Sequence, residues 1–253
     1  MSLRATLNQG TIRLSLASFL LLGVTGWFGL SEVEQEMKKA LQSQLEVTVS
    51  ANKQVLEKWF KERWDDVETF ANMQAARRNI LSLVEKTEGK DISPELLFHS
   101  EEARKLRSLL LPIVERYDYL GFVVFDHSGL QVAALLDSPV GSRDLMAQSD
   151  FVKRALDGET VVSLPFRDKG LLPTLQGEVK SNLPTMFVAS PVRNDAGKVV
   201  AVLAFRIRPE IEFTRVMESS RTGETGETFA FNSEGLMISD SRFNEQLRKM
   251  GLV

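Results

Sequence analysis

The sequence predicts an α+β protein in which an apolar N-terminal helix and a long second helix precede a module built on an antiparallel sheet. Three observations support this. Residues 14–30 carry no charge, residues 31–84 contain neither proline nor glycine, and short apolar runs separated by turn residues follow Tyr119. An uncharged run and a stretch without helix breakers favour helices, whereas short apolar runs between turns are typical of strands.

The composition is that of a globular chain of 253 residues, with 31 basic and 34 acidic residues and a net charge of −3. A nucleic-acid-binding surface needs a clustered basic face, so we expect no nucleic-acid partner. The chain has no cysteine. This excludes disulfides, thiolate catalysis and cysteine zinc sites, but it leaves the compartment open.

A transmembrane helix is predicted over residues 12–30. The uncharged run, extended by Ile12 and by a snorkelling Arg13, approaches the roughly 20 residues that span a bilayer. Trp27 lies near its C-terminal end, where an aromatic belt is expected. A cleaved signal peptide is the alternative, but the small-x-small cleavage site is missing.

The charges that flank this helix predict its orientation. Arg4 and Arg13 precede the uncharged run, and three glutamates between residues 32 and 36 follow it. By the positive-inside rule, residues 1–11 lie in the cytoplasm and the chain from Ser31 onward is extracytoplasmic. The same asymmetry disfavours a buried helix of a soluble protein. We therefore predict a protein of the inner or plasma membrane with a single N-terminal pass.

Residues 31–86 are predicted to form one long stalk helix. Ser31 and Glu34 form a capping box that starts it, and Glu88–Asp91 ends it. Apolar residues recur along it at the three- to four-residue spacing of a helix. In its first half these residues are Val33, Met37, Leu41 and Leu45.

The two halves of the stalk differ in character. Residues 31–54 are polar apart from a thin apolar seam, which is typical of a solvated stalk or of a two-helix coiled coil, and we expect a homodimer. The alternative is a helix buried along its length within one monomer. Residues 55–84 carry two tryptophans and two phenylalanines, so this half is expected to pack against a domain.

A sheet-bearing module is predicted between residues 87 and 210. Ser93–Pro94 starts a shorter helix that reaches Tyr117, with Pro112 kinking or splitting it. Pro191 is expected to place an edge or a bulge in its strand. The predicted strands are 120–126, 130–137, 160–166, 184–192 and 198–207, with a loop and short helix over 141–158 and a polar loop over 167–183.

An internal repeat predicts the start of a second module. The segment Phe122–Leu130 is echoed by Phe229–Leu236, and an Asp-Ser pair follows each, at Asp137-Ser138 and Asp240-Ser241. Two such hairpins indicate two copies of one module, of which residues 211–253 form the incomplete second. Coincidence is the alternative, because strand-turn-strand units look alike.

In their order, these motifs resemble the double Cache sensor domains of bacterial transmembrane receptors. The resemblance covers about residues 31–250. It implies a PAS-like antiparallel sheet in each module and a small-molecule pocket in the membrane-distal one, here residues 87–210. The matching pieces are Phe125–Gly129, Val140–Leu145, Ala155–Gly158, Ser190–Gly197 and Arg221–Phe229.

The resemblance carries no binding residue onto this chain. An arginine and a tyrosine commonly precede the phenylalanine of the family's short helix. This sequence has Gln148, Ser149 and Asp150 before Phe151 instead. The family's amino-acid motif cannot be laid onto the chain.

Candidate ligand-binding residues therefore come from the sequence itself. A pocket needs a few polar groups among aromatics, and an arginine can hold a carboxylate. Arg167 and Arg193 favour a small carboxylate ligand, although Asp150 and Asp168 could equally receive an amine. The alternative for each arginine is an exposed side chain beside an aspartate. The candidates are Asp150, Phe166, Arg167, Asp168, Phe187, Ser190 and Arg193.

No pattern in the sequence supports catalysis, a metal or a cofactor. His99 is explained as a surface residue and His127 as a turn residue. Gly223–Gly226 lacks the following lysine of a phosphate-binding loop, and no nucleophile-elbow motif is present. We expect a protein that is not an enzyme.

The predicted function is the extracytoplasmic sensing of a small molecule by a transmembrane signalling receptor whose output domain is absent from this chain. One alternative is a membrane-anchored exported scaffold that binds a protein partner, which predicts an exposed apolar patch and no enclosed pocket. Another is an exported enzyme, which predicts a cleft with convergent titratable groups.

Overall fold

The computed structural model describes residues 3–88, 92–136, 140–170, 172–173, 179–211, 213–218, 226–239 and 241–251. These fall into two compact units, residues 1–51 and 52–253, each described by itself below. Several sequence motifs lie outside the described residues: Gly89–Asp91 of the predicted helix stop, the pair Asp137-Ser138, the segment Arg221–Thr225, and Asp240.

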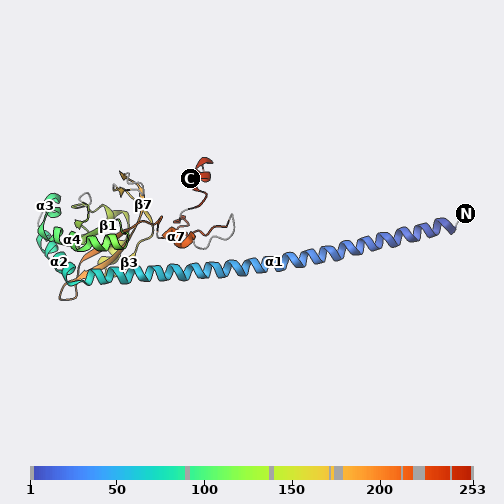
Figure 1. Cartoon of the computed structure of the whole chain (residues 1–253), viewed down its shortest axis with the longest axis horizontal. Coiled ribbons are helices and arrows are strands. Elements are labelled where there is room, and N and C mark those ends of the chain that lie inside the picture. Colours follow the sequence, from blue (N-terminus) through green and yellow to red (C-terminus); the bar gives the residue numbers. More distant parts are fainter. Residues whose placement is uncertain are drawn as a thin grey trace. The chain divides into compact units, whose positions relative to one another are not determined.

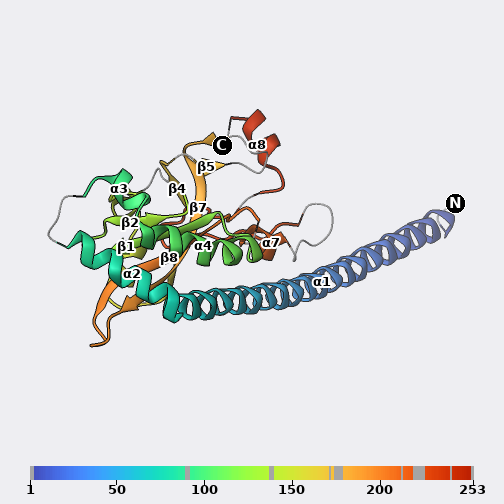
Figure 2. The same cartoon turned by 60° about the vertical axis from the view of Figure 1, so that its left-hand side comes forward.

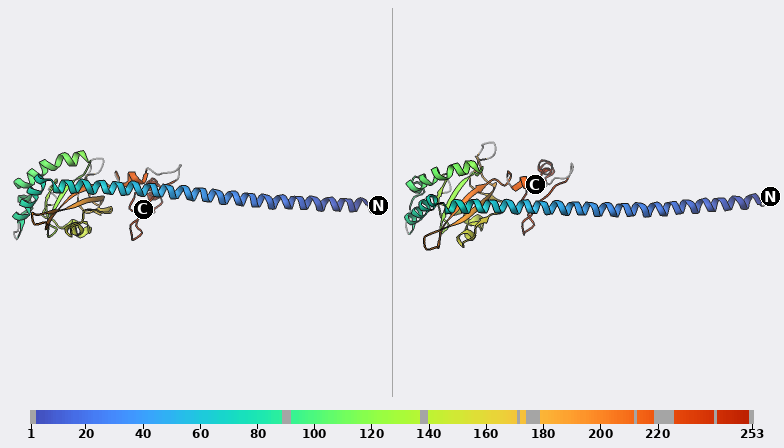
Figure 3. Two further views of the ribbon diagram at one scale, coloured as in Figure 1. Left: turned by 90° about the horizontal axis from the view of Figure 1, so that it is seen from below. Right: turned by 60° about the horizontal axis from the view of Figure 1, so that its bottom comes forward.

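Helix α1 (Leu3–Asn72) contains both the apolar run and most of the stalk. Figure 3 shows it as one continuous ribbon. Among the described residues it is the one helix whose length and composition would allow it to cross a membrane, and the side chain of Trp27 is 75% exposed. Ser31 lies inside the helix, so the predicted capping box is wrong. The apolar run is itself helical, and continuing a helix requires no new nucleation.

The stalk is interrupted at Met73, so the prediction of one unbroken helix to residue 86 is wrong. Met73 has φ −58° and ψ 120°, outside the helical region, and α2 (Gln74–Thr87) begins after it. The break lets α2 bury Ile80 and Leu83 completely in the core. Neither proline nor glycine marks this position in the sequence, so tertiary packing overrides local helix propensity here.

Two serines start two helices where the sequence predicts one. Ser93 precedes α3 (Pro94–Phe98), and Ser100 precedes α4 (Glu101–Arg116). Each hydroxyl accepts a hydrogen bond from the backbone N–H three residues on, which is the usual N-cap arrangement. Helix α4 continues through Pro112. The predicted helix is therefore divided near Ser100, between α3 and α4, and not at Pro112.

The second unit is built on an antiparallel sheet, and the predicted α+β class is confirmed. The strand order is β2-β1-β8-β7-β3, and β4 also pairs with β7. A separate hairpin joins β5 and β6. The strands are β1 (Gly121–Asp126), β2 (Gln131–Ala134), β3 (Val161–Val162), β4 (Phe166–Asp168), β5 (Leu172–Pro173), β6 (Val179–Lys180), β7 (Leu183–Arg193) and β8 (Val199–Ile207).

Two prolines shape the sheet. The single strand predicted over 160–166 is divided into β3 and β4, and Pro165, which cannot donate to a ladder, lies between them. In β7 the pairing with β8 shifts register between Val192 and Arg193, directly after Pro191. The bulge expected near Pro191 is therefore confirmed.

The strands give the sheet two apolar faces, because successive side chains alternate. Phe122 of β1 belongs to the cluster formed with the end of α1, with α2 and with α4, while Phe125 belongs to the opposite cluster. That second face is covered by α3, α5 (Asp144–Gln148) and α6 (Phe151–Leu156). Figures 1 and 2 show the helices α2 and α4 alongside the strands.

Three hairpins close with the same turn. The side-chain oxygens of Asp126, Asn194 and Asn232 each accept the N–H groups two and four residues on, and the glycine three residues on donates to the backbone carbonyl. This is an Asx turn. The two segments of the predicted repeat thus share their turn. The β7–β8 hairpin lies outside the repeat and has it too, so turn chemistry alone accounts for that similarity.

The remaining described helices are α7 (Phe213–Glu218) and α8 (Asn244–Lys249). Between them, the second segment of the predicted repeat makes one isolated bridge, from Phe231 to Met237. Asn52 of α1 donates to the hydroxyl of Thr228 at 3.5 Å, which ties this C-terminal segment to the second unit.

Candidate ligand-binding site

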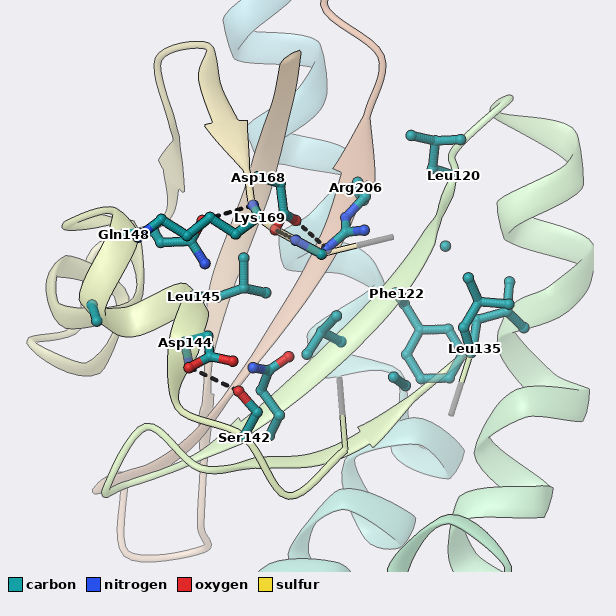
Figure 4. Close-up of a pocket in the computed structure, with 17 residues that line it drawn as sticks. Leu120, Phe122, Leu135, Ser142, Asp144, Leu145, Gln148, Asp168, Lys169 and Arg206 are labelled. Atoms are coloured by element: carbon teal, nitrogen blue, oxygen red, sulfur yellow. Dashed lines mark hydrogen bonds and ion pairs between the residues drawn. The ribbon is translucent and has the colours of Figure 1, made fainter. Parts of the chain in front are cut away.

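A cavity of about 480 Å³ lies over the sheet face that α3, α5 and α6 cover, toward its β1–β2 edge. Residues of β1, β2 and β8 line it, together with α5 and the short loop after β4 (Figure 4). The volume is within the range of small-molecule pockets. All of its lining residues belong to the second unit.

A buried ion pair forms one wall of this cavity. Arg206 Nη2 donates to Asp168 Oδ2 at 2.7 Å, and the two side chains are only 12% and 3% exposed. Asp168 Oδ1 accepts the N–H of Gly170 at 2.8 Å. The Arg206 guanidinium lies 4.9 Å from the ring centroid of Phe187, a cation–π contact. Both oxygens of the carboxylate are therefore engaged by the protein.

Register explains why these groups meet. Arg206 of β8 pairs with Gly121 on one side and with Phe187 of β7 on the other, so its side chain projects from the same face as Phe187. Asp168 is the last residue of β4 and pairs with Leu183 of β7. Burial lowers the pKa of Arg206 from its ordinary value, and the charge of Asp168 opposes that shift. An arginine remains protonated even so.

Two buried polar atoms in the cavity wall lack a hydrogen-bond partner among the described residues. They are Nε of Arg206 and Oε1 of Gln131, whose side chain on β2 is 1% exposed. Buried polar groups are nearly always satisfied, and leaving one unpaired costs about 1–3 kcal/mol. The wall therefore contains one donor and one acceptor that lack a partner, and neighbouring atoms cover both of them.

The rest of the cavity combines apolar walls with a polar rim (Figure 4). Leu145 of α5 is buried and lines one side. At the rim, the backbone N–H of Lys169 donates to Oε1 of Gln148 at 3.1 Å, which joins the loop after β4 to α5. The N–H of Asp144 donates to the hydroxyl of Ser142 at 2.9 Å. Such a pocket suits a ligand with an apolar body and a few polar groups.

The structure brings two of the predicted site residues together at this cavity. Asp168 lines it, and Phe187 lies beneath the guanidinium of Arg206. Phe166 does not line the cavity itself. Its ring centroid lies 6.1 Å from that of Phe187 and 6.4 Å from that of Phe151. The aromatic stack supports the cavity wall from behind.

The other four predicted residues lie away from the cavity. Ser190 is buried and lies 3.3 Å from the hydroxyl of Thr160, and Asp150 is exposed at the start of α6. Arg167 is exposed, and its Nη1 donates to the carbonyl of Asn182. Arg193 is exposed, and its guanidinium donates to backbone carbonyls at the ends of two turns. The argument for a carboxylate ligand from Arg167 and Arg193 thus has no support in their positions.

Sequence reasoning missed Arg206 and Gln131. A signal for Arg206 was present, because it is the one charged residue in an otherwise apolar strand, Val199–Ile207. A charge in such a strand must be paired or used. Gln131 gave no comparable signal, since polar residues are common beside a hairpin turn.

Among the described residues, no group of three His, Cys, Asp or Glu side chains is placed to hold a metal ion. His99 and His127 are both exposed.

The similarity of this chain to known proteins is found among solved structures. No protein-family model matches the chain, and no curated protein sequence matches it. Among solved structures, the sensor domain of the V. cholerae histidine kinase DctB is similar, with 14% identity and a TM-score of 0.47 over 74% of this chain. This chain spans only 60% of that domain's length.

Two chemoreceptor domains are also similar. One is the sensory domain of Campylobacter jejuni Tlp3 with isoleucine bound, at 16% identity and a TM-score of 0.40, covering 78% of this chain and 76% of that one. The other is the ligand-binding domain of Pseudomonas aeruginosa PctC in complex with GABA, at 17% identity and a TM-score of 0.39, covering 79% and 78%. All three similar structures are sensor or ligand-binding domains.

Proposed function

We propose that this chain is the ligand-sensing region of a transmembrane receptor and that the cavity beside Arg206 binds its small-molecule ligand. The observation that carries this proposal is the combination of a buried ion pair with two unpartnered polar atoms in one cavity wall. The resemblance of the sequence motifs to double Cache sensor domains supports the same function. We infer no enzymatic activity, because the motifs resemble those of receptor domains.

The energetics favour a binding role over a purely structural one. A buried ion pair adds little stability compared with apolar residues of the same volume, because both charges lose their hydration. The free Nε of Arg206 and Oε1 of Gln131 add a further cost. A ligand that bonds to both atoms removes that cost, so its binding free energy includes the relief of two unsatisfied groups.

Binding at this cavity would act on several elements at once. The lining residues come from β8, β2, α5 and the loop after β4, and a ligand that contacts them holds these elements together. A ligand shifts a conformational equilibrium by the difference between its affinities for the two states. We propose that this difference is the signal that the receptor transmits.

The domain arrangement follows from the same proposal. Residues 1–11 are cytoplasmic, 12–30 span the membrane, and 31–86 form the stalk, with the break at Met73 that the structure shows. Residues 87–210 form the membrane-distal sensor module, and 211–253 begin a membrane-proximal one. Alkaline phosphatase fused after residue 90 tests the orientation: it is active if that position is extracytoplasmic and inactive if it is not.

A ligand screen by thermal unfolding tests the binding function. The full chain in detergent is screened against amino acids, organic acids, amines and amides. A ligand present at 100 times its Kd stabilises a protein by about 2.7 kcal/mol, which raises Tm by about 5 °C or more for a domain of this size. At least one compound is expected to do so.

A matched pair of variants locates the binding site. Ala147 is exposed and lines the rim of the cavity, so Ala147→Trp should fill the opening without disturbing the core. Ala75 is exposed on α2, away from the cavity, and Ala75→Trp is the control. The shift should vanish in the first variant and persist in the second. A shift that survives Ala147→Trp, or a screen with no stabilising compound, contradicts the proposed function.

A further inference from the structure

We infer that the cavity beside Arg206 selects a ligand that carries no ionised group, and that Asp168 and Gln131 determine this selectivity. This inference rests on the proposed function and adds the chemical class of the ligand. It differs from the expectation of a carboxylate that the sequence alone gives.

The charges around the cavity already balance. Among its described lining residues, the cations are Arg206 and Lys169 and the anions are Asp168 and Asp144. Lys169 and Asp144 are exposed at the rim, where water screens them. Inside the cavity, Arg206 stands 2.7 Å from Asp168, so the one buried positive charge is neutralised by the protein itself.

An anionic ligand would therefore meet a disadvantage at Arg206. Its carboxylate would lose its hydration and approach an arginine that already pairs with Asp168, and the two anions would repel each other. The Asp168 side chain cannot rotate away without losing a hydrogen bond, because its second oxygen accepts the N–H of Gly170. A buried charge is tolerated only when it is paired, and no unpaired buried cation lines this cavity in the described part of the chain.

A cationic ligand would meet the opposite difficulty. Both oxygens of Asp168 are already engaged, by Arg206 and by Gly170. The free acceptor in the wall is Oε1 of Gln131, which is a neutral amide oxygen and does not compensate a buried ammonium charge. A zwitterion combines the two difficulties.

An uncharged polar ligand avoids both the repulsion from Asp168 and the cost of burying an uncompensated charge. A small shift of the wall side chains around the ligand would uncover both atoms. Nε of Arg206 would then donate to a neutral acceptor such as a carbonyl, and Oε1 of Gln131 would accept from a neutral donor such as an amide N–H or a hydroxyl. The apolar body of the ligand would lie against Leu145 and its neighbours. Primary amides and related neutral polar molecules are the class that fits.

Four probes with nearly the same carbon skeleton test this selectivity on the full chain in detergent: isocaproamide, isocaproate, isohexylamine and leucine. Their affinities are measured by thermal shift and isothermal titration. The wild type is expected to prefer isocaproamide by about tenfold or more, a difference of about 1.4 kcal/mol in binding free energy, because a buried charge without a partner is costly.

Two substitutions should redirect the preference. Asp168→Asn keeps an oxygen acceptor but leaves Arg206 uncompensated, so isocaproate should gain about tenfold or more, the value of a hydrogen bond to a charged group. Gln131→Glu adds a buried anion and should favour isohexylamine instead. Asp157→Asn, at an exposed position after α6, is the control and should leave all four affinities unchanged.

Two results would overturn the inference. One is a wild type that binds isocaproate, isohexylamine or leucine at least as tightly as isocaproamide. The other is an Asp168→Asn variant in which isocaproate gains nothing. The proposed function survives both, because it requires only that some compound stabilise the chain and lose that effect in Ala147→Trp.

Discussion

Arg206 Nη2 lies 2.7 Å from Asp168 Oδ2, and this contact joins β8 to β4 across β7, the strand with which both of them pair. The ion pair therefore closes the sheet face over Phe187, whose ring lies beneath the guanidinium. Its position makes it both a structural link and a wall of the cavity.

Breaking this pair from one side should destabilise the fold strongly. Arg206→Met leaves the Asp168 carboxylate buried and unpaired, and we expect a loss of about 3–5 kcal/mol in the free energy of unfolding. The double variant Arg206→Met/Asp168→Asn contains neither charge, so it should recover at least half of that loss. Chemical unfolding of the two variants and the wild type measures this. A double variant less stable than Arg206→Met would contradict the account.

A second ion pair gives the fold a defined acid sensitivity. Lys86 of α2 donates to Glu102 of α4, and this hydrogen bond lowers the pKa of Glu102 below its usual value. A carboxyl whose pKa is lower in the folded state adds stability above its unfolded pKa of about 4.3 and loses it as the pH falls through the folded value. The stability difference between wild type and Glu102→Gln should therefore shrink between about pH 5 and pH 3.

The control for the acid effect is Glu210→Gln, at an exposed position after β8. Unfolding curves at several pH values compare both variants with the wild type. A Glu102→Gln difference that stays constant down to pH 3 would rule out the proposed contribution of this ion pair.

The Asx turn between β1 and β2 should depend on one side-chain oxygen and not on its charge. Oδ1 of Asp126 accepts hydrogen bonds from the N–H groups of Ser128 and Leu130 and from the hydroxyl of Ser128. Asp126→Ala removes all three and should cost about 2–3 kcal/mol. Asp126→Asn keeps the acceptor and should stay within about 1 kcal/mol of wild type, because Asn194 and Asn232 form the same turn. An equal loss in the free energy of unfolding for Asp126→Ala and Asp126→Asn would show that the turn depends on the charge of Asp126.

The apolar seam of the stalk is predicted to form a parallel homodimer. Leu41 and Leu45 of α1 are 56% and 57% exposed in the single chain, and burial between two helices would remove that surface from water. The chain has no native cysteine, so single cysteines can be introduced cleanly. In membranes, crosslinking should be efficient from Leu41→Cys and Leu45→Cys and weak from Ser43→Cys. Equal yields at all three positions would count against the dimer.

Local chemistry made much of the fold predictable. Uncharged and breaker-free segments indicated the helix α1, and D-x-x-G and N-x-x-G turns marked the hairpins whose strands form the sheet. The errors lie where a choice depends on partners distant in the sequence. The break at Met73 serves the packing of α2, and the extension of α1 through Ser31 overrides a local capping signal.

The site was harder to predict for the same reason. Arg167, Asp168 and Arg193 all looked like pocket residues because they stand at strand ends. Only the pairing of β4 and β8 with β7 decides which of them faces the cavity, and it selects Asp168 and brings Arg206 to it. The sequence alone does not determine the register between strands that lie far apart along the chain. A shift of one residue in that register would turn each side chain to the other face of the sheet.

The most direct test of the binding site observes Arg206 itself. Its Nε–H is buried without a partner, so its side-chain resonance in a ¹H–¹⁵N spectrum of the full chain in detergent should respond to any ligand that fills the cavity. The resonance is assigned by its absence in Arg206→Met. The account predicts that a compound that raises Tm also shifts the Arg206 Nε–H signal, in a saturable manner and with the same Kd. A compound that raises Tm while leaving this signal unchanged would contradict the claim that the chain binds its ligand in this cavity.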